Sequence, residues 1–414
     1  MEQTVVTGIG IVSPIGMNRN EVLESLINSK SGIDEITEMD LSSFRNNLGG
    51  VIKSFQKRTT LNGFRSNILT TIAAEEAIQD SLILEQNHFD RNRVAVSVGT
   101  SIGGYGGFVD KLYLDNTKIS NNKQFQLNPC SRVNEIGDII RNIPFSLMSH
   151  EIARRYGFGG PIGASVTACS ASANALIHGR DLINSGRVDA AVILGIDPIT
   201  QLTLLGFNSL MAMTKDELKV MDENRSGLLI GEGAGCIVLE SKEHALKRKA
   251  NIYAELTGCG VSNDAFHSTR PHPDAVGAIL AIKNALNEAK LNPIDIDYIN
   301  LHGTGTKHND MTELKAVEQV FGNEGKIPMS SSKSMTGHTL GAAGLIESII
   351  SILSMRNNII PPNLNFSNKI KGFNYDIVKE TRHNVRLKHV LSNSFGFGGN
   401  CASLIFSEFN NEPI

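Results

Sequence analysis

The feature that most constrains the fold of this 414-residue chain is a repeat, because the same order of short motifs occurs twice. Each copy opens with an apolar run that contains Gly-x-Gly, TGIG at 7–10 and TGCG at 257–260. A run ending in Gly-Thr follows, and then a turn of small residues leads into a long apolar segment, TACSASANAL and MTGHTLGAAGL. Internal similarity of this kind predicts two duplicated halves that share a core.

Within each copy, apolar runs typical of buried strands alternate with segments whose apolar residues recur every three or four positions. This alternation predicts an α/β fold, and the lack of a long Pro/Gly linker predicts that the halves pack closely. The predicted strands are 4–13, 93–101, 189–197, 236–241, 252–262, 297–306, 326–333 and 389–399. The predicted helices are 21–29, 68–82, 172–186, 275–290, 310–321 and 340–355.

Composition excludes several classes of protein. Hydrophobic residues make up 41% of the chain and charged residues 20%, which is typical of a soluble globular protein. The net charge of −3 argues against nucleic-acid binding, and no apolar run approaches the ~20 residues that span a bilayer. The first residues enter a predicted strand without a basic lead, so we expect a cytoplasmic protein with no membrane insertion.

The cysteines and glycines give no sign of a metal or nucleotide site. The five cysteines form no CxxC pair and have no zinc-like spacing with histidine, so we expect neither a disulfide framework nor a metal. Cys236 and Cys401 enter apolar runs and are expected to be packed in strands. The glycine-rich stretch GTSIGGYGG lacks the Lys-Ser/Thr ending of a phosphate-binding loop. No cofactor is predicted.

Cys169 lies among small residues where an apolar run gives way to a predicted helix. At the N-terminal end of a helix, unpaired N–H groups and the helix dipole can stabilise a thiolate. The small neighbours Ala168, Ser170, Ala171 and Ser172 leave room for a large substrate. This stretch by itself fits either a packed core cysteine or a nucleophile.

His302 ends an apolar run and is followed by glycines and threonines. A histidine there can project from the carboxyl edge of a sheet, where α/β proteins bind their ligands. The alternative is a surface histidine that ends a strand. Thr304 and Thr306 could be simple turn formers, or their hydroxyls could hold an amide-rich ligand.

His338 lies in a glycine-rich turn before a small-residue helix, with Lys333 five residues upstream and Glu347 nine residues downstream. Lysine in a run of serines is usually solvated, but Lys333 stands between a predicted strand and a helix that reads as buried. Phe397, between glycines, is unusual for a core and suits a gate whose backbone N–H groups can face an oxyanion.

One cysteine, two histidines and a lysine at strand ends of a repeated architecture fit thioester chemistry. A thiolate supplies the nucleophile for covalent catalysis. Two imidazoles that donate through Nε2 can polarise a thioester carbonyl, and backbone N–H groups can stabilise an oxyanion.

The motifs TACSASANA, LHGTGTKHND, SSSKSMTGHTLGAAGLIE and SNSFGFGG together resemble those of the β-ketoacyl-acyl-carrier-protein synthases of the type II elongating kind. The resemblance runs from VVTGIGIVSPIG near the N-terminus to ASLIF near the C-terminus. It implies a thiolase-like five-layered αβαβα sandwich of two halves, 1–250 and 251–414. It also implies a homodimer that acts on acyl groups carried by the phosphopantetheine of an acyl carrier protein.

The resemblance implies a decarboxylative Claisen condensation. Cys169 would receive the acyl group, and His302 and His338 would hold the malonyl thioester carbonyl while CO₂ leaves. The backbone N–H groups of Cys169 and Phe397 would form the oxyanion hole. Lys333, paired with Glu347, would organise His338 and the electrostatics of the site.

The resemblance also assigns binding roles. Thr304, Thr306 and Thr269 match positions that contact the pantetheine arm, and Phe397 matches the gate. Phe108 aligns with the wall of the acyl pocket, where a bulky ring implies a short or unusual acyl chain. Departures from the family pattern occur at 221, 226 and 228, and at 400 and 401, where they leave the hydrogen bonds of the gate loop open.

Carrier proteins are acidic, so a basic patch is expected despite the net negative charge. The predicted patch is Lys57, Arg58, Arg65 and Arg270, although ordinary solvated surface charge explains each of them equally well.

Alternative functions remain open on the sequence. The chain could be a ketosynthase subunit of specialised metabolism that pairs with a chain-length-factor-like partner. It could also be a CoA-dependent thiolase, but that chemistry needs a second catalytic cysteine. A partner subunit without activity is disfavoured because Cys169, His302 and His338 are all present.

Overall fold

The computed structural model describes residues 3–53, 65–85, 90–106 and 143–409. Its N-terminal half builds a sheet in the order β1-β7-β6-β4-β5. β4 runs parallel to β5 and β6, whereas β7 is antiparallel to both of its neighbours. The bounds of these strands are β1 (Thr4–Val12), β4 (Val94–Gly99), β5 (Ile162–Ser165), β6 (Ala190–Asp197) and β7 (Gly233–Ser241).

The C-terminal half repeats this sheet. Its order is β8-β15-β14-β9-β10, with β9 parallel to β10 and β14, and β15 antiparallel to its neighbours. The same order with the same directions confirms the predicted duplication. The strands are β8 (Ala254–Asn263), β9 (Tyr298–Asn300), β10 (Pro328–Ser330), β14 (His389–Phe395) and β15 (Asn400–Ser407), and β12 (Asp376–Ile377) extends the edge beyond β10.

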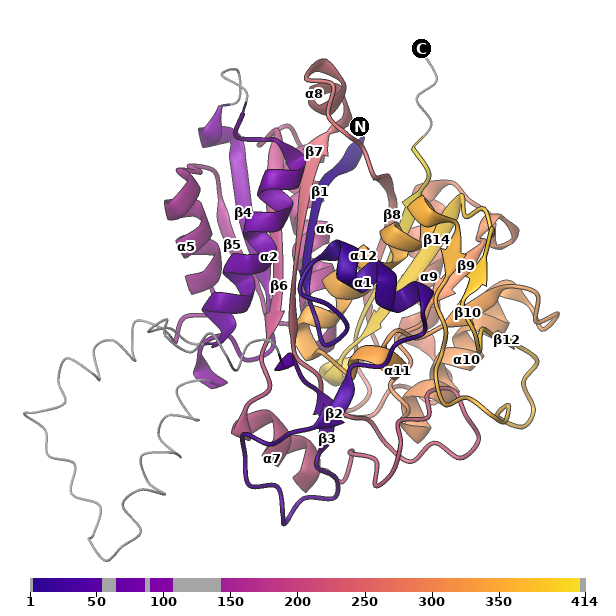
Figure 1. Ribbon diagram of the computed structural model, residues 1–414. Helices are drawn as coiled ribbons and strands as arrows, with labels where there is room; N and C mark the ends of the chain where they lie inside the picture. The colour runs from indigo at the N-terminus through magenta and orange to yellow at the C-terminus, as the bar shows by residue number, and fades with distance from the viewer. Residues whose placement is uncertain (1–2, 54–64, 86–89, 107–142, 410–414) are drawn as a thin grey trace, which may run out of the picture.

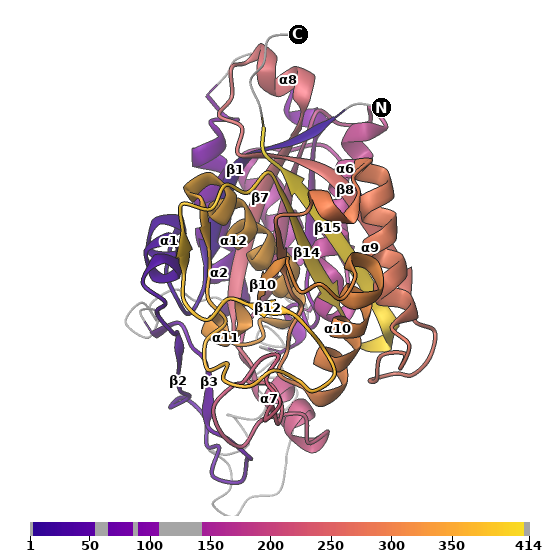
Figure 2. The same cartoon turned by 90° about the vertical axis from the view of Figure 1, so that its right-hand side faces the viewer.

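Helices complete five layers, as Figures 1 and 2 show. The first sheet packs against α2 and α5 on one face and against the central pair of α6 and α12 on the other. The central pair also covers the second sheet, whose outer face carries α9 and α10. The predicted αβαβα sandwich is therefore confirmed. The helices are α2 (Arg65–Ser81), α5 (Leu147–Tyr156), α6 (Ala171–Asn184), α9 (Val276–Ala289), α10 (Lys307–Phe321) and α12 (Ala343–Asn357).

The serines of the central helix α12 can be buried because their hydroxyls are bonded within the helix. Every residue of α12 from 343 to 355 is buried. The hydroxyls of Ser348, Ser351 and Ser354 each donate to the carbonyl four residues earlier, which satisfies them without a water contact. A helix with an apolar surface all round and internally bonded serines suits the middle layer.

The two sheets meet where β1 pairs with the start of β8, through Val5 with Glu255 and Val6 with Ala254. Residue 250, the predicted boundary between the halves, lies in the link from α8 to β8, and this division stays a prediction. None of the described helices is long and apolar enough to cross a membrane. The smaller elements are α1 (Arg19–Ile27), β2 (Ile33–Glu35), β3 (Leu48–Gly50), α7 (Gln201–Ser209), α8 (Lys242–Lys247), α11 (Lys333–Thr336), β11 (Ile359–Ile360) and β13 (Arg382–His383).

Candidate active site

Cys169 lies in a short turn, 168–170, between β5 and the first residue of α6, where the sequence predicts the helix to begin. Ala168 has a φ of 51°, so the backbone turns sharply before the cysteine. Gly99 at the end of β4 lets the start of α6 pack against the strand, because a Cβ at position 99 would lie 2.2 Å from the Cα of Ser172. The turn holds Cys169 at the carboxyl edge of the first sheet with 7% of its surface exposed.

The second half builds the same turn before α12, and the match shows how the duplication places His338. Leu340 has a φ of 52° and begins a short turn, 340–342, as Ala168 begins the turn before α6. Asp197, at the end of β6, accepts the N–H of Gly341 at 2.6 Å and also binds the hydroxyls of Thr100 and Ser101. Asp197 thereby ties the second turn to the first sheet; the sequence interpretation missed this residue.

His338 faces the nucleophile directly. Its Nε2 lies 3.2 Å from Sγ of Cys169, and its Nδ1 accepts the backbone N–H of Leu340 at 3.2 Å. An accepting Nδ1 places the ring proton on Nε2. Burial, and then the charge of Lys333, lower the pKa of His338 well below its ordinary value, so the ring is a neutral Nε2–H donor.

His302 lies beside His338, with ring centroids 5.3 Å apart and the rings nearly perpendicular. Nζ of Lys333 is 3.4 Å from its Nδ1, and an ammonium can only donate, so the proton of this ring also lies on Nε2. Burial, Lys333 and His338, in that order, lower the pKa of His302. Both imidazoles are therefore neutral and present the same kind of donor.

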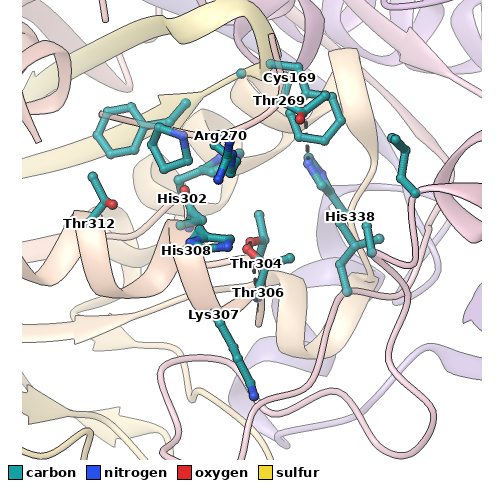
Figure 3. A pocket seen from close by; sticks show the side chains of 18 of the residues that line it. Cys169, Thr269, Arg270, His302, Thr304, Thr306, Lys307, His308, Thr312 and His338 are labelled. Carbon is teal, nitrogen blue, oxygen red and sulfur yellow. Dashed lines mark hydrogen bonds between the residues drawn. The ribbon is translucent and has the colours of Figure 1, made fainter. Parts of the chain in front are cut away.

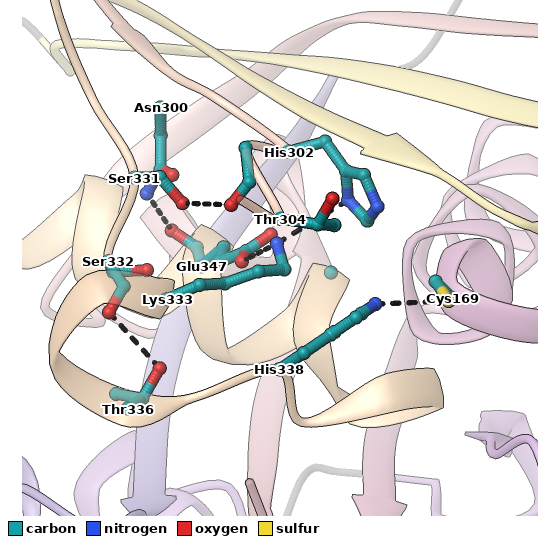
Figure 4. Close-up of polar contacts among 12 residues, drawn as sticks. Cys169, Asn300, His302, Thr304, Ser331, Ser332, Lys333, Thr336, His338 and Glu347 are labelled. Carbon is teal, nitrogen blue, oxygen red and sulfur yellow. Dashed lines mark hydrogen bonds and ion pairs between the residues drawn. The ribbon is translucent and has the colours of Figure 1, made fainter. Parts of the chain in front are cut away.

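Lys333 and Glu347 form a buried ion pair next to the histidines (Figure 4). Burial raises the pKa of Glu347, and the Lys333 ammonium opposes that rise. The role expected of Lys333 at His338 stays a prediction: burial and then its charge lower the pKa of His338, while its hydrogen bond goes to His302. The reason is tertiary: α11 places the lysine between Glu347 and the end of β9, while His338 turns toward Cys169.

Two further acids missed from the sequence hold the loop after β9. Glu313 accepts the backbone N–H groups of His302 and Gly303, both at 2.8 Å. Asp310 accepts those of Thr304 and Gly305 at 3.0 and 3.2 Å. The available signal was their spacing, since two acids three residues apart share a face of the predicted helix 310–321 directly after the His302 motif.

Burial opposes the thiolate that was expected at Cys169. Burial raises the pKa of Cys169 to about 12, although the charge of Lys333 and the backbone N–H of Phe397 lower it. The position at the helix start therefore does not outweigh the loss of water around the sulfur.

These groups end a cavity of about 440 Å³ (Figure 3). Cys169, His302 and His338 are among the buried residues that line it. Thr269, Thr304 and Thr306 line it, as does Arg270 of the predicted carrier patch. The hydroxyls of Thr304 and Thr306 are 2.9 Å apart and face one passage.

Phe397 borders the same cavity and stacks on Phe207 of α7, with ring centroids 5.7 Å apart. Its loop has the supports that the sequence left open: Nδ2 of Asn400 donates to the carbonyl of Phe397, and Nδ2 of Asn263 donates to that of Gly398, both at 3.0 Å. Cys401 lies in β15, buried as expected, and also touches the cavity.

Other predicted residues lie elsewhere. Arg65 turns inward, where its Nε donates to the buried Glu232 at 2.6 Å, so it belongs to an internal ion pair. Lys57, Arg58 and Phe108 lie outside the described residues. Within the described ranges, no cluster of three or more His, Cys, Asp or Glu side chains could hold a metal ion.

Comparison with known families decides the identity of the fold. Models of the beta-ketoacyl synthase N-terminal and C-terminal domains match residues 1–245 and 253–367. The chain belongs to the beta-ketoacyl synthase family. The synthase is 35% identical to 3-oxoacyl-[acyl-carrier-protein] synthase 2 of Coxiella burnetii, over 98% of each chain. It is 34% identical to the Staphylococcus aureus enzyme of the same name, over 99% of each chain.

Solved structures agree. The ishigamide ketosynthase/chain length factor superposes with a TM-score of 0.87 at 30% identity, covering 99% of this chain and all of the other. A type II polyketide ketosynthase, solved with its acyl-carrier protein and a bound hexaketide, gives 0.88 at 28% identity with the same coverage. The synthase is thus a condensing enzyme, an acyltransferase of fatty acid or polyketide elongation, as the resemblance implies.

Proposed function

We propose that this synthase joins an acyl group held on Cys169 to a malonyl group held on an acyl carrier protein. The observation that carries the proposal is the pair of imidazoles, both neutral and both with the proton on Nε2, beside one buried thiol. Such a pair can bind a thioester oxygen without protonating a carbanion.

In the loading step, Sγ of Cys169 attacks the acyl-carrier thioester carbonyl. The oxyanion lies against the backbone N–H groups of Cys169 and Phe397, and the C–S bond to the carrier breaks. The proton of the Cys169 thiol ends on the carrier thiol, so the exchange is balanced. Because burial raises the pKa of the Cys169 thiol to about 12, little free thiolate exists at neutral pH. The thiol must therefore lose its proton as the sulfur attacks.

In the condensation step, the Nε2–H groups of His302 and His338 bind the malonyl thioester oxygen. The bond to the carboxylate breaks, CO₂ leaves, and the electron pair becomes an enolate held by both imidazoles. The enolate carbon attacks the acyl group, and the Cys169 sulfur departs and takes a proton from solvent. Lys333 fixes the His302 tautomer and therefore acts as a positioning residue.

The passage to Cys169 suits a pantetheine arm. Thr269, Thr304 and Thr306 line it with hydroxyls, which can bond the amide groups of the arm. A free CoA thioester is the rival donor, since thiolase chemistry also uses a buried cysteine. That chemistry needs a second acid-base cysteine, and the Cys401 thiol is bonded to the Gly399 carbonyl at 3.5 Å with a pKa raised by burial. The carrier is therefore favoured.

A dimer is also part of the proposal. β5 ends the sheet in the described chain, and Ile162 on it is 44% exposed. An open strand edge with exposed apolar residues favours pairing with another chain. A second copy is the simpler partner, and a chain-length-factor-like subunit is the alternative because the solved relatives include such pairs. A cytoplasmic location stays a prediction.

The central test is intact mass spectrometry after incubation with a panel of acyl carriers. The wild type should gain one acyl mass on Cys169, and Cys169→Ala should gain none. Condensation by Cys169→Ala should fall by about 10³-fold or more, while malonyl decarboxylation stays measurable. Acylation of the variant, or of another residue, would refute the assignment of the nucleophile.

The histidines are tested separately. His302→Ala or His338→Ala should slow malonyl decarboxylation by about 10²-fold or more, since each removes one donor to the enolate oxygen. Acyl loading should be less affected. Normal decarboxylation by either variant would show that its imidazole does not hold the malonyl thioester.

A further inference from the structure

We propose that Asp197 is a positioning residue for the condensation, because its carboxylate holds His338 within reach of Cys169. Asp197 is the last residue of β6 and is completely buried. It lies between the loop after β4, residues 100–102, and the turn 340–342, so it joins one loop from each half of the molecule. The inference rests on the proposed function, since it concerns one of the two imidazoles that bind the malonyl thioester.

The turn 340–342 needs an external support. Leu340, its first residue, has a φ of 52°, which is unfavourable for a bulky side chain. The backbone N–H of Gly341 donates to Oδ2 of Asp197 at 2.6 Å, and this bond fixes the peptide group that follows Leu340. The N–H of Leu340 itself donates to Nδ1 of His338 at 3.2 Å. The carboxylate therefore holds the residue that orients the His338 ring.

The same carboxylate holds the loop after β4. Oδ1 accepts the hydroxyl of Thr100 at 2.6 Å, and Oδ2 accepts the hydroxyl and the backbone N–H of Ser101 at 2.5 and 2.9 Å. The turn and the loop are in close contact, since a Cβ on Gly341 would lie 2.4 Å from the Ser101 nitrogen. The end of β4 packs in turn against the start of α6. Asp197 therefore connects the His338 turn to the part of the first sheet that supports Cys169.

The partners of Asp197 in the described chain are neutral, and all of them can donate. They are the hydroxyls of Thr100 and Ser101 and the backbone N–H groups of Ser101, Ile102 and Gly341. Burial raises the pKa of Asp197, and these hydrogen bonds lower it. Burying a carboxylate costs free energy, and buried acids of this kind cluster at functional sites. The place of this acid between two active-site turns gives it a role in the reaction.

The position of the His338 ring matters because the reacting groups are close. Its Nε2 lies 3.2 Å from Sγ of Cys169 (Figure 4). A displacement of about 1 Å can slow a reaction about 10²-fold. Without Asp197 the turn 340–342 can relax, and the ring moves with it. Decarboxylation should then lose the contribution of His338 and keep that of His302, which a different loop carries.

The experiment is a double-mutant cycle on the decarboxylation of malonyl-acyl carrier protein. Asp197→Ala is measured alone, with His338→Ala and with His302→Ala. Alone and with His302→Ala it should slow decarboxylation about tenfold or more, but with His338→Ala by less than about twofold, because the ring that it positions is already gone. Acyl transfer to Cys169, measured on the same variants, should fall less than decarboxylation does. A general loosening of the fold would slow decarboxylation in every background.

Two further variants complete the design. In Asp197→Asn the amide oxygen can keep the Gly341 N–H while the NH₂ group faces the Thr100 hydroxyl, which can accept, so decarboxylation should exceed that of Asp197→Ala several-fold. Thr100→Val/Ser101→Ala keeps the carboxylate and removes two of its donors, so it serves if Asp197→Ala does not fold. It should slow decarboxylation several-fold, again only where His338 is present.

Glu240→Gln is the matched control. Glu240 is an equally buried acid of the same sheet, and it pairs with Ala190, at the opposite end of β6 from Asp197. Its replacement removes a buried charge far from the His338 turn, so the folded variant should decarboxylate like the wild type.

Three results would overturn the inference. Asp197→Ala could decarboxylate like the wild type, its effect could be equal with His338→Ala and with His302→Ala, or Glu240→Gln could lose as much activity. In each case slow decarboxylation by His338→Ala leaves the proposed reaction standing. Normal decarboxylation by His338→Ala would instead refute the role proposed for that imidazole.

Discussion

The chemistry of single side chains depends on which nitrogen of each imidazole holds the proton. A backbone N–H fixes His338, and the Lys333 ammonium fixes His302. Burial, and then the charge of the same ammonium, lower the pKa of both rings. Burial and this charge therefore keep both imidazoles neutral, as the enolate oxygen requires, while two different donors set their orientation.

Replacing Lys333 should move the pH dependence of decarboxylation. In Lys333→Ala the pKa of both histidines rises, because the repulsion from the ammonium is lost. Activity that needs neutral imidazoles is lost as the pH falls through that raised pKa, so the acidic limb should move to higher pH. The readout is malonyl decarboxylation between pH 5 and 8.

Two companion variants keep this test specific. Lys333→Arg retains the charge and should stay nearer the wild-type acidic limb. Lys333→Ala leaves Glu347 buried and unpaired, at a cost to stability of about 3–5 kcal/mol, whereas Lys333→Ala/Glu347→Gln avoids the unpaired charge. An acidic limb that stays in place in both alanine variants would contradict the role of Lys333.

Glu313 should make stability depend on pH. Burial raises the pKa of Glu313 to about 7 in the folded chain, from an ordinary value of 4.5. The stability that this difference contributes is present at low pH and lost as the pH rises through 7. The free energy of unfolding of the wild type, relative to Glu313→Gln, should fall by about 2 kcal/mol from pH 5.5 to pH 8. Denaturant unfolding at both pH values measures it, and a constant difference would refute the raised pKa.

At the scale of elements, the turn between β14 and β15 is packed directly on the turn that carries Cys169. A Cβ on Gly396 would lie 3.0 Å from the Thr167 carbonyl oxygen and 3.1 Å from the Cys169 backbone nitrogen. Only a residue without a side chain leaves that nitrogen free to face an oxyanion. The glycine is therefore a requirement of the close approach between two loops.

Gly396→Ala should disturb acyl loading. The added methyl group must push the two loops apart by a few tenths of an ångström, which shifts the N–H groups of Cys169 and Phe397. Loss of one oxyanion donor lowers the rate about 10²–10³-fold, so a loss approaching that range is expected for acyl transfer. Rapid-quench measurement of acyl-enzyme formation tests it, with Gly206→Ala on α7 as the control, since no atom lies within 4 Å of a Cβ there. Equal rates of acyl-enzyme formation for the two variants would show that the close contact between Gly396 and the Cys169 turn does not affect acyl transfer.

At the scale of the whole molecule, the four-residue strand β5 lies at an open edge of the described sheet, as β12 does at the other end. The sheets of the two halves are hydrogen-bonded to each other through β1 and β8. In the described chain, β5 pairs with a single strand, β4. Ile162 and Ala164 on β5 are exposed. The Cys169 turn follows β5 directly, so pairing along this edge would also support the active site.

Charges on this edge should separate the proposed dimer. Ile162→Lys/Ala164→Lys places like charges opposite each other across a two-fold pairing, which disfavours it. Native mass spectrometry should show a dimer for the wild type and a monomer for the variant. Ile294→Lys is the control, since Ile294 is 82% exposed and does not lie on β5. A variant that remains dimeric would place the interface elsewhere, and a monomeric wild type would favour a different partner subunit.

Local patterns predicted most strands and helices, the duplication and the position of Cys169 at a helix start, but they did not predict α5 or α7. The apolar run 189–197 forms the strand β6, and the segment 340–355 contains the buried helix α12. Both could be predicted because the spacing of apolar residues along the chain indicates which residues are buried. The four motifs also identified the family, since each follows a strand end in order. His302 and His338 were singled out for the same reason.

Only the tertiary structure decided how those residues are protonated and held. The hydrogen bond from Lys333 to His302, the support of Glu313 under the His302 loop and the tie of Asp197 to Gly341 each join segments far apart or on different elements. The pKa of Cys169 depends on how completely water is excluded, which helix position does not reveal. Electrostatics and hydrogen bonding depend on distances in space, and the order of residues along the chain does not determine those distances.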